Sequence, residues 1–516
     1  MKSTRMQFLV LPLLLACCIG SRVEGQNQAS KVRRAAVAGQ FYPSDPAHLK
    51  LAVQQFLADA RPAAAGKPIA IVVPHAGYLF AGQIIADAFS QAKGQIYDVV
   101  VILGTNHGRN QASAGLTGIS VYANGAYETP LGIARVDEGM ASDLLAEDTD
   151  CKMNPAPQEN EHSIEVQVPF VQVLFPSAKI LPVMIGMPDP TMCARLGRAL
   201  AKIARDKRVL LVASSDLSHF PRYEHASTVD RQTLESIARI DPAQFTSKVH
   251  ALMSQGTPNL DTCACGEGPI LAAMTAAKAM GAGRGVVVSY ANSGDAIAED
   301  RSRVVGYGSV AFVAGNGEPD VKALSRPTGL PPSGPLQAAD KKTLLKLARQ
   351  SLQRFLATET IPLARDLAPR LQFPQGAFVT LKQHGELRGC IGQLAGEFPL
   401  GLTTSWMAVQ AGVNDSRFSP VTLKELSGLE IEISVMTPMK PIAKSSEIVV
   451  GRDGVVIQKA GRSAVFLPQV ATEQGWGLAE MLDNLCLKAG LPRDAWKSGA
   501  QFRVFQADVF SEAQFK

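Results

Sequence analysis

An α/β fold with a largely parallel sheet is predicted for the N-terminal part of this 516-residue chain, followed by a smaller α+β domain. Three observations support this prediction. Runs of β-branched apolar residues alternate with helical patterns, several runs are apolar throughout, and three of them lead directly into a histidine. Runs that are apolar throughout are typical of strands buried on both faces of a parallel sheet, and alternation with helices is typical of α/β domains.

The elements of the N-terminal domain are predicted in chain order from these patterns. The three runs that lead into a histidine begin at Ile69, Val99 and Leu210 and reach His75, His107 and His219. Further strands are predicted at residues 179–185, 285–291 and 304–313, and helices at residues 80–93, 138–146, 191–205 and 269–280.

A proline-rich segment divides the chain. Five prolines with interspersed glycine and serine lie between residues 316 and 337, a composition that favours extended chain. We therefore predict an N-terminal domain over residues 31–315, a linker over 316–338 and a C-terminal domain over 339–516, with few contacts between the domains. In the C-terminal domain, helices are predicted at residues 341–356 and 478–488 and strands at residues 377–382, 429–436 and 463–467.

The first 25 residues have the pattern of an export signal. Lys2 and Arg5 precede an apolar stretch over residues 8–19, which is too short to span a membrane and has the length of a signal-peptide core. Cys17 follows two leucines and an alanine, as in bacterial lipoproteins, so lipidation at Cys17 and simple cleavage before Gln26 are both open. The protein is expected to be exported, with membrane attachment only through a lipid; a cytoplasmic location is the alternative.

Charge and cysteine content indicate which kinds of ligand and cross-link to expect. The 51 basic and 46 acidic residues give a net charge of +5, without a dense stripe of lysine and arginine, so nucleic-acid binding is not indicated. Only six cysteines follow the leader, far fewer than in a disulfide scaffold. Seven of the eight histidines precede the linker and only His384 follows it, so a histidine metal site is expected in the N-terminal domain.

The three histidines that follow strands are candidates for one pocket. Open α/β sheets collect ligands at the carboxyl ends of their strands, and several imidazoles at one such edge indicate a metal site. Asp216 and His219 are three residues apart and face the same direction if the chain there enters a helical turn. The alternative is that Asp216 or a neighbouring serine caps a helix.

Two further groups are candidates for the same pocket. Glu161, His162 and Glu165 offer acid–base chemistry, or else form a polar helix start with a solvated face. Cys265 precedes a predicted helix, whose N-terminus is expected to lower the pKa of the thiol and favour a metal-binding or reactive thiolate. The alternatives are a buried inert thiol and a redox pair with Cys263.

Spaced motifs along the chain resemble two known families. Resemblance to the Memo family rests on AGQFYP at 38–43, PHAGY at 74–78, TNH at 105–107, EHSIE at 161–165, SDLSH at 215–219, and Cys265-Gly266 followed by Pro269. Resemblance to the AMMECR1 family rests on LRGCIG at 387–392, DSRF at 415–418, LEIEIS at 429–434 and GRDG at 451–454.

The Memo resemblance implies a fold similar to class III extradiol dioxygenases. It also implies iron or copper held by His75, His107 and Cys265, with Asp216 and His219 beside the metal. Those dioxygenases have a carboxylate where Memo proteins have the cysteine, so ring cleavage is not implied. Asp216 is therefore the alternative third ligand, since two histidines and one carboxylate form the common oxygen-activating iron site. A fused chain of this kind further implies a radical SAM protein as partner.

These observations lead to three functional hypotheses. The first is a metal-dependent oxidoreductase in which His219 acts as acid–base group, Asp216 orients it, and Glu161 and His162 take part in catalysis. The second is a non-catalytic metal-binding scaffold that recognises a protein or peptide. The third is a hydrolase that uses the same metal to activate water.

Overall fold

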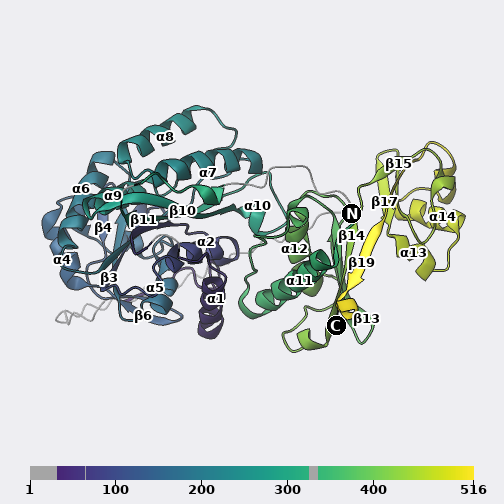
Figure 1. Cartoon of the computed structure of the whole chain (residues 1–516), viewed down its shortest axis with the longest axis horizontal. Helices are drawn as coiled ribbons and strands as arrows, with labels where there is room; N and C mark the ends of the chain where they lie inside the picture. The colour runs from purple at the N-terminus through teal and green to yellow at the C-terminus, as the bar shows by residue number, and fades with distance from the viewer. Residues whose placement is uncertain (1–31, 64–65, 316, 325–334, 516) are drawn as a thin grey trace, which may run out of the picture.

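A computed structural model describes residues 32–63, 66–315, 317–324 and 335–515 (Figure 1). The expected export signal, with Cys17, lies outside the described residues. Among the described helices, none is both long and apolar enough to cross a membrane.

An eight-stranded sheet forms the centre of the N-terminal domain. Its strands are, in spatial order, β10 (Ala282–Asn292), β11 (Gly306–Ala314), β2 (Pro68–Val73), β9 (Val209–Ser214), β3 (Val99–Thr105), β8 (Lys179–Ile185), β4 (Ile119–Val121) and β7 (Cys151–Met153). The four central strands, from β2 to β8, are parallel. A small separate sheet contains β1 (Val32–Arg33), β5 (Ala126–Thr129) and β6 (Gly132–Arg135).

The large sheet is mixed: the prediction of a largely parallel sheet holds for its centre and for the outer pair of β4 and β7, and is wrong for the other pairs. β10 pairs antiparallel with β11, β11 with β2, and β4 with β8. The connection from β10 to β11 contains only the four-residue helix α10 (Ser293–Ala296), whereas a parallel return usually carries a longer helix that packs on the face of the sheet. The apolar runs predicted β2, β8, β10 and β11 but not β4, and they carry no information on strand direction.

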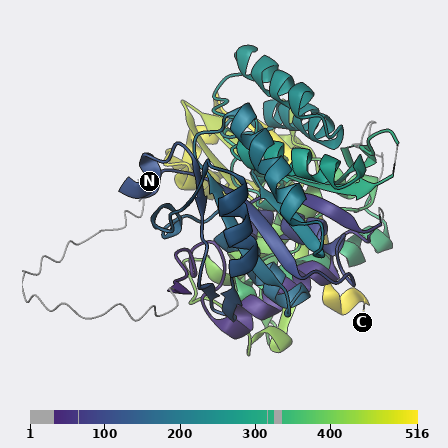
Figure 2. The ribbon, with the colours of Figure 1, turned by 90° about the vertical axis from the view of Figure 1, so that its left-hand side faces the viewer.

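Helices cover both faces of the sheet (Figures 1 and 2). One face carries α1 (Pro46–Ala58), α2 (Tyr78–Ser90) and α5 (Val168–Leu174), and the other carries α4 (Glu138–Glu147), α6 (Pro190–Ile203), α7 (Tyr223–Ala238), α8 (Pro242–Ser254) and α9 (Glu267–Ala279). Along β3, Val99, Val101 and Leu103 enter one core while Val100 and Ile102 enter the other, as the two-residue period of a strand requires. The four helices predicted in this domain are confirmed within a few residues.

The C-terminal part contains two four-stranded antiparallel sheets, each with a core of its own. The first has β13 (Glu386–Gln393), β12 (Ala377–Gln383), β14 (Leu429–Met436) and β19 (Ala507–Ser511), covered by α11 (Ala338–Thr358) and α12 (Leu400–Val413). The second has β15 (Lys440–Ile442), β18 (Gln501–Phe505), β16 (Gly454–Lys459) and β17 (Arg462–Phe466), packed on α13 (Pro468–Glu473) and α14 (Leu478–Lys488). The second sheet forms the lobe farthest from the N-terminal domain (Figure 1).

The expected linker is partly folded onto the N-terminal domain. Asp320 forms a bridge with Val286 of β10, and its carboxylate accepts a hydrogen bond from Arg284 at 3.0 Å. Leu324 is buried in the core beneath α7. Residues 325–334 lie outside the described part of the chain.

The two parts of the chain are joined by charged contacts, so the expectation of few contacts between them was wrong. The guanidinium of Arg365 pairs with the fully buried carboxylate of Asp87 on α2, with one hydrogen bond of 2.9 Å. Arg61 pairs with Asp366 through hydrogen bonds of 2.6 and 2.9 Å. Arg354 of α11 pairs with an aspartate at the end of α1. The C-terminal part is thereby fixed to α1 and α2.

Replacing Arg365 by alanine should destabilise the protein by about 3 kcal/mol, because it leaves the buried carboxylate of Asp87 without its cation. Urea unfolding of the two variants would measure this. Arg61→Ala is the matched control, since its ion pair with Asp366 is exposed and should contribute less than about 1 kcal/mol. Equal losses in both variants would contradict the interpretation.

Candidate metal centre

Three side chains converge at the carboxyl edge of the parallel strands. His75 follows β2, His107 follows β3, and Cys265 precedes α9. One ligand atom from each lies within 4.8 Å of the others. The Cys265 sulfur is 3.1 Å from Nε2 of His75, and the two imidazole rings meet edge to face with centroids 5.0 Å apart. The His75 side chain is 1% exposed and that of His107 is 25% exposed, so the cluster opens to solvent on the side of His107.

The tautomer of His75 follows from its hydrogen bonds. Nδ1 of His75 lies 3.0 Å from the hydroxyl oxygen of Ser214, at the end of β9. That hydroxyl donates its one hydrogen to the carbonyl of Ser163 at 2.6 Å, so it can only accept from His75. Nδ1 therefore carries the proton, and Nε2 is left as the free lone pair beside Cys265.

Glu161 fixes the second histidine in the same way. Its Oε1 lies 2.9 Å from Nδ1 of His107, and its Oε2 accepts the His107 backbone N–H at 3.0 Å. The backbone N–H groups of His162 and Ser163 also donate to it. Burial alone would raise the pKa of Glu161, but the neighbouring imidazoles lower it well below its ordinary value. The ionised carboxylate therefore accepts the Nδ1 proton of His107, which leaves Nε2 available for a metal.

Cys265 is a protonated thiol in the metal-free protein. Burial, followed by the nearby charge of Asp216, raises its pKa well above the ordinary value. The expected lowering by the N-terminus of α9 was therefore wrong, because desolvation of this sulfur outweighs the effect of the helix dipole. A cation that binds here would release the thiol proton.

Cys263 is not bonded to Cys265 in this structure. Both thiols are free, as are the other cysteines of the described part of the chain. The Cys263 sulfur is buried and lies 3.6 Å from the sulfur of Met253.

Glycines allow the site to assemble. A Cβ atom at Gly266 would lie 2.4 Å from the carbonyl oxygen of Ser214, so only glycine lets the chain after Cys265 approach β9 this closely. A Cβ atom at Gly104 would lie 2.4 Å from the side chain of Ile164. The segment that carries Glu161 therefore packs directly against β3.

Asp216 and His219 are both at the site, but not on a helical turn. Residues 215–218 after β9 form no helix or turn, and His219 forms a bridge with Val305. Asp216 caps no helix of its own. Its Oδ1 instead accepts the backbone N–H groups of His75 and Ala76 at 2.7 and 3.2 Å. Burial raises the pKa of Asp216 to about 6.

His219 offers a nitrogen without a partner. Nε2 of His219 is buried and has no hydrogen-bond partner among the described residues. Burial, and then the charge of His107, lowers the pKa of His219 to about 4. The ring is therefore neutral at physiological pH, and it lies close enough to His107 for the two side chains to interact electrostatically.

His162 lies against both ligand histidines. Its ring centroid is 4.5 Å from that of His107 and 5.2 Å from that of His75. His107, Glu161 and His162 form a second group whose ligand atoms lie within 4.8 Å of one another. Glu161 already accepts four N–H groups. The cluster of His107, Glu161 and His162 is therefore better suited to orient His107 than to bind a second metal. Glu161 and His162 are buried, so the alternative of a solvated face was wrong.

Glu165 belongs to the fold and not to the site. Its carboxylate accepts hydrogen bonds from Arg33 at 2.6 Å, from the hydroxyl of Tyr42 at 2.5 Å, and from the backbone N–H groups of Ala36 and Val37. This buried network fastens the first described strand to the segment that carries Glu161. The role of Arg33 was missed from the sequence, where it is one of two adjacent arginines.

The donor set fits a transition metal. Two imidazoles and one thiol converge at a partly enclosed edge of the sheet, and each imidazole presents Nε2 because its Nδ1 is hydrogen-bonded elsewhere. Nitrogen and sulfur ligands suit copper, iron and zinc rather than magnesium or calcium. The ligand set alone does not select one of these metals.

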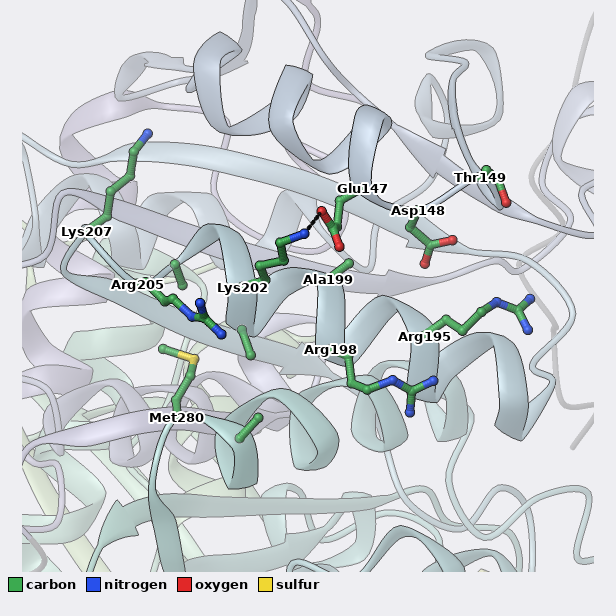
Figure 3. A pocket seen from close by; sticks show the side chains of 13 residues that line it. Glu147, Asp148, Thr149, Arg195, Arg198, Ala199, Lys202, Arg205, Lys207 and Met280 are labelled. Carbon is green, nitrogen blue, oxygen red and sulfur yellow. Dashed lines mark hydrogen bonds and ion pairs between the residues drawn. The ribbon is translucent and has the colours of Figure 1, made fainter.

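A hollow of about 850 Å³ at the opposite, amino edge of the sheet has a different character (Figure 3). It is lined by side chains of α4, α6 and the end of α9, with no histidine or cysteine among them. Two of its cations are already neutralised, because Lys202 pairs with Glu147 and Arg195 with Asp150. It is not continuous with the histidine cluster.

Comparison with known proteins gives matches to both parts of the chain. A family model described as Memo-like protein matches residues 33–311, and one described as AMMECR1 matches residues 345–510. The MEMO1 family protein MK0963 of Methanopyrus kandleri is 34% identical over 297 residues, which are 55% of this chain and 99% of the relative. The MEMO1 family protein of Aquifex aeolicus is 33% identical over 287 residues, covering 55% of this chain and all of the relative. A crystal structure of an uncharacterised protein from Pyrococcus horikoshii, 36% identical, covers 34% of this chain and 93% of its own, with a TM-score of 0.33.

Replacing Glu165 by glutamine should cost roughly 3 kcal/mol or more of stability, because Arg33 then remains buried without its carboxylate. The folded fraction should keep the metal content of the parent protein. Glu128→Gln is the matched control, since Glu128 pairs with the exposed neighbour Arg34 and should contribute less than about 1 kcal/mol. Urea unfolding and metal analysis measure both effects. Loss of metal from folded Glu165→Gln would mean that Glu165 belongs to the site.

Proposed function

Since this chain belongs to the Memo-like protein family, we propose that it is a metal-dependent oxidoreductase that holds iron or copper through His75, His107 and Cys265. The observation that carries the proposal is the convergence of these three ligand atoms within 4.8 Å. A bound iron or copper ion would supply one-electron chemistry at the open side of the cluster. The fold relation to class III extradiol dioxygenases, inferred from the sequence, is consistent with this proposal and remains a prediction.

The side chains around the cluster have distinct roles in this proposal. His219 is the acid–base group, because its buried Nε2 has no hydrogen-bond partner among the described residues and its ring is neutral. Asp216 accepts the backbone N–H groups of His75 and Ala76 and so holds the backbone on either side of the His75 Cα atom. Glu161 orients His107, and His162 packs against both ligand rings.

Cys265 is favoured over Asp216 as the third ligand. The Cys265 sulfur lies 3.1 Å from Nε2 of His75, whereas the nearer contact of the Asp216 carboxylate to that nitrogen is 4.0 Å. Oδ1 of Asp216 is also occupied by two backbone N–H groups. The carboxylate is therefore better placed to position the His75 loop than to bind the metal.

We also propose a partner and a location. A radical SAM protein is the proposed partner, supported by the family resemblance of both domains. Export is proposed from the signal-like pattern of residues 1–25. Cell fractionation of the full-length chain and of Cys17→Ala would test location: lipidation predicts a membrane fraction that the substitution abolishes, and unprocessed protein in the cytosol would contradict export.

The proposed activity is tested by preparing the protein without oxygen, measuring its bound metal and recording oxygen uptake. An oxidoreductase should contain iron or copper and consume oxygen with a suitable reductant. A scaffold would bind metal without turnover, and a hydrolase would work equally well with redox-inert zinc. Either of these results would overturn the proposal.

Two substitutions should separate the candidate third ligands. Cys265→Ser should weaken metal binding by more than the 10–100-fold that loss of an outer-shell partner typically costs, and should remove any thiolate-to-metal charge-transfer absorption. Asp216→Asn should keep the metal, because an amide oxygen can still accept the two backbone N–H groups. His225→Ala, an exposed histidine of α7, is the control and should change nothing. Metal retained in Cys265→Ser and lost in Asp216→Asn would instead make this a carboxylate site.

A further inference from the structure

Two pairs of an aromatic ring and an arginine flank the cluster. On one side, the ring of Phe41 lies 4.7 Å from that of His162, and the guanidinium of Arg109 sits 5.5 Å from the centre of the Phe41 ring. On the other side, the ring of Phe220 lies 5.5 Å from that of His219. His162 and His219, which border the three ligand residues, therefore each lie next to an aromatic ring that is in contact with an arginine.

The second pair is completed by Arg303. Its guanidinium lies 4.6 Å from the centre of the Phe220 ring. The backbone fixes this arrangement, because Phe220 donates its N–H to the carbonyl of Val304, next to Arg303, at 2.8 Å. Phe220 itself adopts a φ of 70°, which turns the chain after His219 toward this loop.

The charges of Arg109 and Arg303 are not neutralised by the protein. Both residues are exposed, and neither forms an ion pair or a side-chain hydrogen bond within the part of the chain that the structure describes. Their contacts to the rings hold the guanidinium groups near the site without satisfying their donors. A guanidinium with free N–H groups is a fork that matches a carboxylate.

Arg109 is the better placed of the two. It lies two residues after His107, and its charge contributes to the lowered pKa of His162. Arg303 shares its side of the site with Asp261, whose exposed carboxylate acts to raise the pKa of His219. The backbone N–H of Asp261 donates to the carbonyl of His219. The other nearby carboxylates, Glu161 and Asp216, are buried and already accept N–H groups. On the side of Arg109, the exposed charge next to the metal site is therefore positive.

We propose that the metal centre takes a small organic acid, whose carboxylate binds Arg109 while the remainder of the molecule reaches the open side of the cluster beside His107. This inference rests on the proposed function, since it names the class of substrate for the same site. Arg303 adds a weaker, longer-range attraction, and Asp261 opposes it.

Binding of benzoate to the protein as purified, with its own metal, tests the proposal. Isothermal titration should show that benzoate binds and that benzamide, its neutral isostere, binds at least about tenfold more weakly, because only the carboxylate forms charged hydrogen bonds to the guanidinium. Arg109→Gln should weaken benzoate binding by a similar factor and leave benzamide unaffected. Asp261→Asn should strengthen benzoate binding, and Arg303→Gln should weaken it less than Arg109→Gln does.

Arg198→Gln is the matched control. Arg198 is an exposed arginine of α6 that lines the hollow at the opposite edge of the sheet (Figure 3), so its substitution should leave benzoate binding unchanged. Equal binding of benzoate and benzamide, unchanged binding in Arg109→Gln, or a preference for inorganic phosphate over benzoate would each overturn the proposal.

The same experiment separates this inference from the proposed function. Metal analysis before the titration tests the function on its own. Protein without iron or copper that still binds benzoate through Arg109 would overturn the function and keep the anion site. Protein with metal and without benzoate discrimination would overturn only the anion site.

Discussion

The parallel pairing of β2, β9 and β3 is the constraint on which the rest of the site depends. Val73 of β2 lies beside Ser214 of β9, and Leu103 of β3 beside Ala213, so the three strands end at nearly the same level. Each then has only one or two residues before its functional side chain, His75, Asp216 or His107. Parallel strands deliver side chains to one edge from segments far apart in sequence, and the hydrogen bond between Asp216 and the His75 backbone joins two of these ends.

Buried polar groups are compensated at this edge by nearly complete hydrogen bonding. Glu161 accepts four N–H groups, and Ser214 receives a ring nitrogen while donating to Ser163. Such networks fix the orientation and tautomer of each ligand before any metal arrives. Nε2 of His219 is one of several buried side-chain atoms at this edge without a hydrogen-bond partner in the described part of the chain, and Oε1 of Gln167 is another. Groups left unsatisfied inside a largely satisfied network are the ones expected to contact a ligand.

Much of this arrangement could be predicted from the sequence. The runs ending in His75, His107 and His219 predicted both the strands and their meeting point, because apolar runs are a strong local signal. Strand direction could not be predicted in this way, since it depends on how the segments between strands run, as between β10 and β11. Helices α1 and α8 were missed, although each begins with an Asp-Pro pair whose aspartate caps the first turn. The roles of Ser214 and Arg33 depend on partners 139 and 132 residues away in sequence, which no local pattern encodes.

Helix α2 connects the attachment point of the C-terminal part to the metal site. Its first residue, Tyr78, comes three positions after His75, and Asp87 near its other end holds Arg365. A helix of this length is a stiff rod of about 20 Å. The ligand loop and the domain junction are thus opposite ends of one rigid element. Coupling between two sites is reciprocal. If the contact of Arg365 with Asp87 increases the affinity for the metal, then bound metal strengthens that contact between the two parts of the chain by the same free energy.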